Sequence, residues 1–277
     1  MRGEYLQFSV SVHYYQYLIG MLFIILGLPK RSDANVGSVF HRILIEHLDE
    51  VNDPGFNSEG RTASNKETYL YSFADDIVLL YLEGFLLQSH IKRIRSANDG
   101  EVRGVIYELT LAASFVRLGY KIKWLTDESQ PEFTAIKDSI AIDVEAKRRN
   151  RHNSSDEEYK LTREIRAFRA NFKNALTKTR TNKYLVCLDS DLPPAASFDL
   201  KDLYEAMSKE FGSNDLKDTA ILMTNYGFEY LPDGQNYANS SLVIKDKNSI
   251  DDEVLEALIR SINADMPDAV SQEWPIN

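Results

Sequence analysis

The order of apolar patterns along the chain predicts an α/β fold in which helices flank a central mixed sheet. Short alternating or apolar runs typical of strands recur after residue 119, and stretches with helical spacing separate them. Before residue 99 the patterns are mainly helical. Strands with interleaved helices pack as a sheet covered on both faces, and 277 residues can bury a substantial core. We therefore expect a mainly helical N-terminal region at 1–98 and an α/β domain at 99–277.

The N-terminal region begins with a dense apolar run at 17–28. This run is shorter than the roughly 20 residues that span a bilayer, and no small-residue cleavage site follows it. A buried helix or strand is therefore favoured over a membrane anchor or signal, although both stay open. Helical spacing recurs at 36–51 and over one long stretch at 67–94. Turn residues at 96–100 then end the region.

A helix predicted at 102–118 carries the first acidic residue of interest. Gly119 is a natural stop for this helix. Leu111 and Phe115 lie three and seven residues beyond Glu108, so they share its side of the helix and Glu108 points inward. An ionised, buried carboxylate needs a partner. A metal ion and a buried Arg or Lys both meet that need, whereas a glutamate at the edge of the apolar side would need neither. The sequence leaves these three alternatives open.

Three strands are predicted next, at 120–125, from 131 onward, and at 140–146, with polar turns between them. The third strand alternates between charged and apolar residues, which places them on opposite faces. We expect its apolar face to enter the core and its charged face to line a cleft. The charged face carries Asp143, Glu145 and Lys147.

The rest of the chain continues the alternation of helices and strands. A helix is predicted at 156–179, followed by a strand at 182–189 and a helix at 199–211. Two further strands at 219–225 and 241–245 and a final helix at 251–263 complete the expected fold.

Two short motifs, Pro131-Glu132 and Glu145-Ala146-Lys147, follow the predicted helix in this order. The region 102–192 resembles the PD-(D/E)XK nuclease superfamily, which has the restriction-endonuclease-like fold. The resemblance implies an αβββαβ core with a central mixed sheet flanked by helices. The first acid of the family is usually Asp, whereas this chain has the longer Glu132.

The resemblance also implies a role for each matching residue. Glu132 and Glu145 would ligate a metal ion, Lys147 would be the catalytic lysine, and Glu108 would ligate directly or through water. Asp143 lies outside the motif, as a supporting group or a surface charge. Mg²⁺, with Mn²⁺ as an alternative, prefers such oxygen ligands and lowers the pKa of a bound water. A neighbouring ammonium group can stabilise the developing negative charge or help to deprotonate that water.

Positive charge is concentrated after the third strand, although the whole chain has a net charge of -10. A negative protein repels nucleic acid in general, so local basic residues are needed to bind a phosphate backbone. Some of them directly follow the Glu145-Ala146-Lys147 run, and we expect the others, from residue 160 onward, to lie on the side of the 156–179 helix opposite its apolar residues. A solvated helix face is the alternative. The predicted phosphate-binding residues are Arg148, Arg149, Arg151, Lys160, Arg163, Arg166, Arg169 and Lys173.

The cysteine and the histidines indicate which kinds of metal site and which cellular environment to expect. Cys187 is the single cysteine, so no disulfide framework or cysteine zinc site is expected, in keeping with a reducing, cytoplasmic location. The five histidines have no metal-ligand spacing and are expected to be structural or on the surface. His152, which follows the motif, is the one histidine that a loop could bring near the site.

We therefore expect a metal-dependent endonuclease that hydrolyses phosphodiester bonds in DNA, in prokaryotic defence or repair. RNA stays an alternative substrate. Many nucleases of this kind act in pairs, so a homodimer is one expected arrangement. The alternative function is a non-catalytic nuclease-like fold that serves as a nucleic-acid-binding or protein-interaction module.

Overall fold

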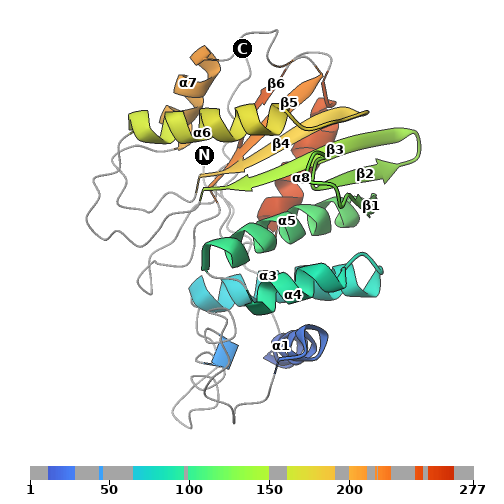
Figure 1. The fold of residues 1–277 in the computed structure, drawn as a ribbon. Coiled ribbons are helices and arrows are strands. Elements are labelled where there is room, and N and C mark those ends of the chain that lie inside the picture. Colours follow the sequence, from blue (N-terminus) through green and yellow to red (C-terminus); the bar gives the residue numbers. More distant parts are fainter. Residues whose placement is uncertain are drawn as a thin grey trace, which may run out of the picture.

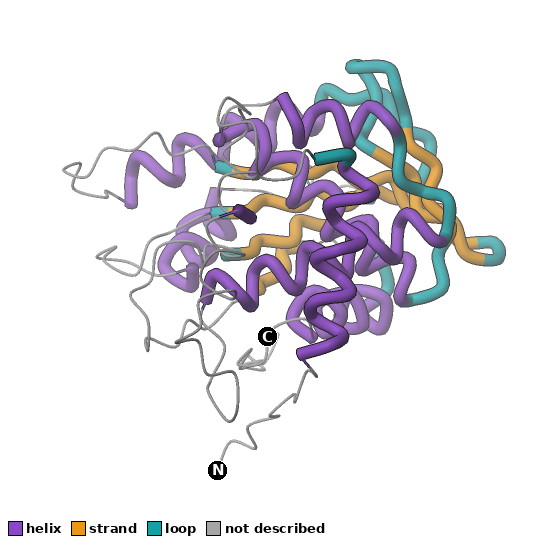
Figure 2. Tube along the Cα trace, turned by 90° about the horizontal axis from the view of Figure 1, so that it is seen from below, coloured by secondary structure: helices purple, strands orange, loops and turns teal. Residues whose placement is uncertain are grey.

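The computed structural model describes residues 12–28, 44–45, 65–96, 99–149, 161–190, 200–210, 216, 218–225, 241–245 and 249–264. Within these residues, helices flank a six-stranded mixed sheet, as Figure 1 shows and Figure 2 shows after a quarter turn. The predicted α/β class and mixed sheet are therefore confirmed.

The sheet follows the order of the chain, from β1 to β6. β3, β4 and β5 are parallel to one another, and the other neighbouring pairs are antiparallel. This arrangement places β3 and β4 in the interior of the sheet. The strands are β1 (Lys121–Trp124), β2 (Phe133–Lys137), β3 (Ile140–Arg148), β4 (Lys183–Asp189), β5 (Thr219–Thr224) and β6 (Ser241–Lys245).

Helices cover both faces of this sheet. α5 and α8 lie on one face, whereas α6 and α7 lie on the other (Figure 1). The run α5-β1-β2-β3-α6-β4 has the order of elements expected from the sequence. The helices are α1 (Val12–Leu26), α3 (Asn65–Leu82), α4 (Gln88–Ser96), α5 (Asp99–Arg117), α6 (Leu161–Leu176), α7 (Leu200–Glu210) and α8 (Asp252–Ala264).

Alternating side chains of the inner strands build a core on each face of the sheet. Val144 and Leu185 pack with Phe115 of α5 on one face. Val186 packs with Phe172 of α6 on the other. Strands buried on both faces read as almost continuous apolar runs, which explains the composition of β4 and β5.

The N-terminal helices extend the core on the α5 side. α1 packs against α3, and α3 packs against α5, so these helices form successive layers below the sheet (Figure 1). Leu18 and Leu22 of α1 are fully buried, so one side of the segment 17–28 lies in the core as predicted. Tyr17 and Ile24, on the other side, are exposed. Of the helices described, none has both the length and the apolar character needed to cross a membrane. The boundary predicted at 98–99 stays a prediction, because one hydrophobic core runs across it.

The single long helix expected at 67–94 is wrong, because the chain forms two helices there. α3 ends at Leu82, and Gly84 adopts a positive φ of 76°. The Phe85 amide then donates to the Leu80 carbonyl at 2.8 Å, which closes the helix end in a Schellman-type cap. A new helix, α4, begins at Gln88. The helix expected at 36–51 lies outside the described residues except for 44–45, which are helical.

Candidate active site

Glu132, Glu145 and Lys147 meet where β2 begins beside β3. The Glu132 amide donates to the Val144 carbonyl at 3.0 Å, which continues the β2–β3 pairing and sets Glu132 across from Glu145. Lys147 Nζ lies 2.6 Å from Glu145 Oε1 and 3.4 Å from Glu132 Oε1. The ammonium group therefore bridges the two carboxylates. Sequence motifs that are thirteen residues apart thus form one cluster.

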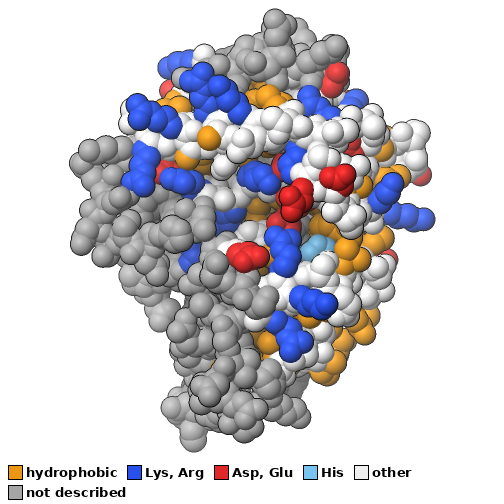
Figure 3. All heavy atoms as spheres, viewed as in Figure 1, with side chains coloured by type: hydrophobic (Ala, Val, Ile, Leu, Met, Phe, Trp, Pro, Cys, Tyr) orange, Lys and Arg blue, Asp and Glu red, His pale blue; other side chains and the backbone are white. Residues whose placement is uncertain are grey.

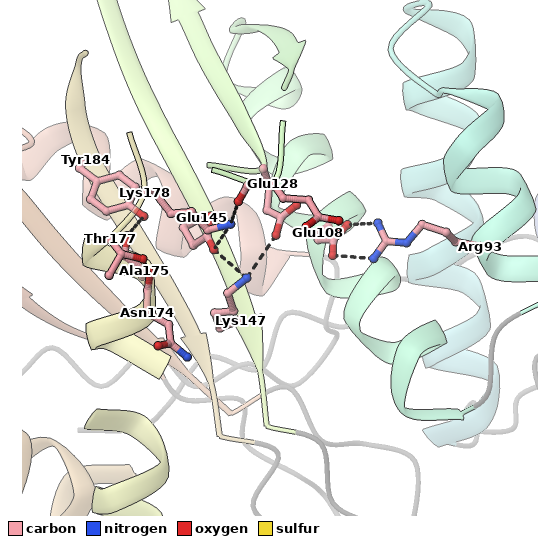
Figure 4. Close-up of polar contacts among 11 residues, drawn as sticks. Arg93, Glu108, Glu128, Glu145, Lys147, Asn174, Ala175, Thr177, Lys178 and Tyr184 are labelled. Carbon is pink, nitrogen blue, oxygen red and sulfur yellow. Dashed lines mark hydrogen bonds and ion pairs between the residues drawn. The ribbon is translucent and has the colours of Figure 1, made fainter. Parts of the chain in front are cut away.

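Glu108 approaches this cluster from α5 and is paired with Arg93 of α4 (Figure 4). Arg93 donates two hydrogen bonds, of 2.7 Å to Oε2 and 3.0 Å to Oε1. Burial raises the pKa of Glu108, the Arg93 hydrogen bonds oppose that rise, and the charge on Glu132 adds to it. The inward direction expected for Glu108 is confirmed, since the residue is only 6% exposed. An arginine is its partner in this structure, although the Arg93 side chain is itself 38% exposed and therefore not the buried cation that was expected.

Glu145 is fully buried and has two lysines beside the same oxygen. Lys147 is the nearer, and Lys178 Nζ lies 3.6 Å from Oε1. Oε2 is buried and accepts no hydrogen bond from any residue that the structure describes. Burial raises the pKa of Glu145, and the charge on Lys147 opposes the rise. Burial lowers the pKa of Lys147, but the charges and hydrogen bonds of Glu145 and Glu132 together outweigh this effect, so the net shift is upward.

The carboxylates of Glu132 and Glu145 fit a divalent cation in part. The space between them accommodates a positive group, because Lys147 occupies it, and Glu145 Oε2 has a lone pair with no donor among the described residues. Mg²⁺ and Mn²⁺ prefer such oxygen ligands. However, across the described segments no three or more His, Cys, Asp or Glu side chains are already arranged around one point. Lys147 would have to turn away for a cation to enter.

Asp143 has a structural role and does not face a cleft. It is buried and accepts four hydrogen bonds from three residues. The donors are Thr134 Oγ1 at 2.8 Å, Thr181 N at 3.0 Å, Asn182 N at 3.2 Å and Asn182 Nδ2 at 2.9 Å. The sequence predicted that Asp143, Glu145 and Lys147 line an open cleft. This prediction is wrong for Asp143 and Glu145, which are buried. They lie on the interior strand β3, which helices cover on both faces.

The basic residues divide between the surface and the interior. Arg163, Arg166, Arg169 and Lys173 are exposed on α6, whereas Phe168 and Phe172 are buried, so the predicted two sides of this helix are confirmed. Figure 3 shows Lys and Arg side chains gathered on the face over α6.

Two of the predicted phosphate-binding residues have partners inside the protein. The side chain of Arg148 is only 2% exposed, and its Nε lies 3.2 Å from Asp189 Oδ2. Arg148 therefore does not contribute to the exposed basic surface, contrary to expectation. Arg149 is part-exposed and pairs with Glu164 at 3.3 Å. Arg151, Lys160 and His152 lie outside the described residues.

Sequence reasoning missed Arg93 and Lys178. Arg93 lies fifteen residues before Glu108 on a separate helix, and no spacing rule connects the two. Lys178 follows α6 in a short polar segment that resembles any exposed loop. Its position next to Glu145 becomes visible only when α6 packs on the sheet.

His90 packs between α4 and β1 and is not a ligand candidate. Its ring lies 4.2 Å from the Trp124 ring, and the Trp124 indole donates to the Phe85 carbonyl at 2.6 Å. Burial, followed by the charge of Arg93, lowers the pKa of His90 to about 4. The expectation of a structural histidine agrees with these contacts, which tie α4 to β1.

Comparisons with known proteins return no match for this chain among protein-family models, curated proteins or solved structures.

Proposed function

We propose that this chain is a metal-dependent endonuclease that hydrolyses phosphodiester bonds in DNA, built on a restriction-endonuclease-like core. One observation carries the proposal: Lys147 Nζ lies within 3.4 Å of two carboxylates, Glu132 and Glu145, that come from neighbouring strands. Two acids and a lysine at the junction of a helix and three strands are the groups that metal-assisted phosphodiester hydrolysis needs.

Glu132 and Glu145 would hold the cation. Bound there, Mg²⁺ or Mn²⁺ would supply positive charge next to the scissile phosphate and a water of lowered pKa. Glu145 offers Oε2, which accepts no hydrogen bond from the described residues, and Glu132 is part-exposed at the start of β2. The buried Glu145 carboxylate thus lies at the inner side of the proposed site, and the part-exposed Glu132 carboxylate lies at its solvent side.

Lys147 and Glu108 have supporting chemical roles in this proposal. The Lys147 ammonium, about one-third exposed, is available to stabilise negative charge on the phosphate or to take part in proton transfer. Arg93 uses both oxygens of Glu108, so we assign Glu108 to ordering the site through a hydrogen-bonded water, not to direct ligation.

The exposed side of α6 supports the choice of nucleic acid as substrate. Its four described basic residues contrast in sign with the chain as a whole, which has a net charge of -10. A local basic surface next to an acidic, cation-binding site can bind the phosphate backbone while the site engages one phosphodiester.

The experiment is a cleavage assay with the full chain on plasmid DNA and on single-stranded RNA, with Mg²⁺, Mn²⁺ or EDTA. Glu145→Gln and Lys147→Met are expected to lower the cleavage rate by at least about 100-fold. Glu256→Gln, an exposed change on α8, is the matched control and should cleave as the parent does. Cleavage that persists in both site variants, or in EDTA, contradicts the proposal.

A second candidate is a nucleic-acid-binding module without turnover. It is favoured by the fact that all three glutamates have cationic partners in this structure and no three-carboxylate group is arranged among the described residues. DNA binding in EDTA without cleavage under any metal condition would support this module over the enzyme.

A further inference from the structure

Lys178 is a second lysine of the candidate site, and no motif includes it. It follows α6, and its side chain is only 19% exposed. Its Nζ lies 3.6 Å from Glu145 Oε1 and donates to the Glu128 carbonyl at 2.6 Å. Glu128 belongs to the connection that leads into Glu132. Lys178 therefore contacts both of the segments that carry the two proposed ligands (Figure 4).

The backbone around Lys178 is held on both sides. The Thr179 amide donates to the Ser129 carbonyl at 2.7 Å. Two residues later, the amides of Thr181 and Asn182 donate to the buried carboxylate of Asp143. Lys178 is therefore not a freely moving surface lysine, since hydrogen bonds fix its segment beside β3.

The charges of the described site balance without a metal ion. Three carboxylates face three cationic groups, and each carboxylate has at least one cation within 4 Å. The acids are Glu108, Glu132 and Glu145, and the cations are Arg93, Lys147 and Lys178. Binding of a divalent cation would give the site an excess of positive charge, and the lysines would repel the cation strongly at such short distances. Binding of a phosphodiester, which is an anion, would reduce that excess.

We infer that Lys178 weakens the binding of a divalent cation at this site and strengthens the binding of a phosphodiester. Its charge opposes entry of a divalent cation beside Glu145 and attracts the phosphate of the substrate. The ammonium carries three N–H donors, and the Glu128 carbonyl accepts only one, so a phosphate oxygen can accept another. The inference rests on the proposed function and assigns to the same site a residue that sets its relative affinity for the cation and for the substrate phosphate.

Two binding constants, each measured without the other ligand, test this role. Isothermal titration with Mn²⁺ in the absence of nucleic acid gives the Kd for the cation. Fluorescence anisotropy of a short labelled DNA duplex in EDTA gives the Kd for the phosphate backbone. Both are measured on the full chain and on Lys178→Met, Lys178→Arg and Lys121→Met.

In Lys178→Met, we expect Mn²⁺ to bind about three- to tenfold more tightly and the duplex to bind about three- to tenfold more weakly. Lys178→Arg keeps the charge, so both constants should stay within about twofold of the parent. Lys121→Met removes the same charge from an exposed position on β1, which controls for the change in net charge. It should leave both constants within about twofold of the parent.

Opposite changes in the two Kd values separate this role from a merely structural one, because damage to the folded site would weaken the binding of both ligands. Weaker Mn²⁺ binding by Lys178→Met therefore overturns the inference. Two unchanged Kd values overturn it as well. If Lys178→Met does not fold, Lys178→Gln and the Arg variant provide the same comparison. A parent chain that binds no Mn²⁺ and cleaves nothing defeats the proposed function as well. If the parent chain binds Mn²⁺ and cleaves DNA, but Lys178→Met does not change the two Kd values in opposite directions, only the inference about Lys178 is wrong.

Discussion

Arg93 and Glu108 form a two-hydrogen-bond ion pair that joins the N-terminal helices to the candidate active site. Arg93 comes from α4 and Glu108 from α5, and the two helices pack side by side below the sheet. The helical N-terminal region therefore contributes a charged group to the site as well as apolar surface to the core.

Arg93→Met should lower the free energy of unfolding by about 2–4 kcal/mol, because it leaves the Glu108 carboxylate buried without its partner. Urea denaturation at neutral pH measures this loss. The double variant Arg93→Met/Glu108→Gln has no unpaired charge, so it should lose less stability than the single variant. A double variant that is as unstable as the sum of the two single changes would contradict the coupling.

Asp143→Ala should lower the free energy of unfolding by about 2–4 kcal/mol, since four donors lose one buried acceptor. Urea denaturation again measures the effect. Asp127→Ala is the control, because the exposed Asp127 carboxylate accepts hydrogen bonds only from Ser129 among the described residues, and its loss should have a much smaller effect. Equal losses in the two variants would mean that Asp143 does not anchor the segment that carries Lys178.

His90 should make the protein less stable as the pH falls from 6.5 to about 4. Its folded pKa lies below 6.5, the ordinary value for histidine, so in this range the unfolded chain binds more protons and unfolding is favoured. The contribution lost by pH 4 is about 2–3 kcal/mol. The raised pKa values of Glu108 and Glu145 act with the opposite sign, so stability from those groups falls as the pH rises above 4.5.

The difference between the parent and His90→Phe isolates the histidine. Phe keeps an aromatic ring against Trp124 but cannot be protonated. Urea unfolding of both proteins at several pH values should show that the advantage of the parent over the variant shrinks on acidification. A difference that does not change with pH would contradict the neutral, buried state of His90.

Alanine substitutions at two glycines should have effects of opposite sign. Gly84 has a φ of 76° and no atom within 4 Å of an added Cβ, so Gly84→Ala costs about 1 kcal/mol through backbone strain alone. Gly104 lies within α5 and also has open space, so Gly104→Ala should raise the free energy of unfolding by about 0.5–1 kcal/mol. Thermal melts of both variants test the pair, and a stabilised Gly84→Ala would contradict the cap that ends α3.

Mn²⁺ should stabilise the parent protein and not Glu145→Gln. At a free concentration of 100 times the Kd, a ligand specific to the folded state adds about 2.7 kcal/mol. A thermal melt with and without Mn²⁺ measures this, and EDTA should reverse it. Stabilisation of the same size in Glu145→Gln would place the cation elsewhere.

Local periodicity predicted most of the elements, because it reports which side of a helix or strand is apolar. The strands from β1 to β6 and the two sides of α6 follow from it directly. The long helix at 67–94 was wrong because the spacing of its apolar residues continues across Gly84, where a positive φ redirects the chain. A continuous helical periodicity in the sequence is thus compatible with two separate helices in the structure.

Periodicity also identified the residues of the site but not their environment. Alternation along β3 correctly separated Glu145 and Lys147 from Val144 and Ala146. It could not show that the charged face is covered, since that depends on where α6 and its following segment pack. Arg148 is the other example: its burial against Asp189 requires β4 to lie alongside β3.

The sequence alone determined the order of the strands and the residues that meet across β2 and β3, because neighbouring strands bring their residues together in a regular register. Only the tertiary structure determined which arginine and lysine side chains lie next to the glutamates. Arg93 is fifteen residues from Glu108, and Lys178 is fifty from the Glu128 carbonyl that it binds. Such pairs depend on how whole helices pack on the sheet, and neither composition nor spacing along the chain encodes that packing.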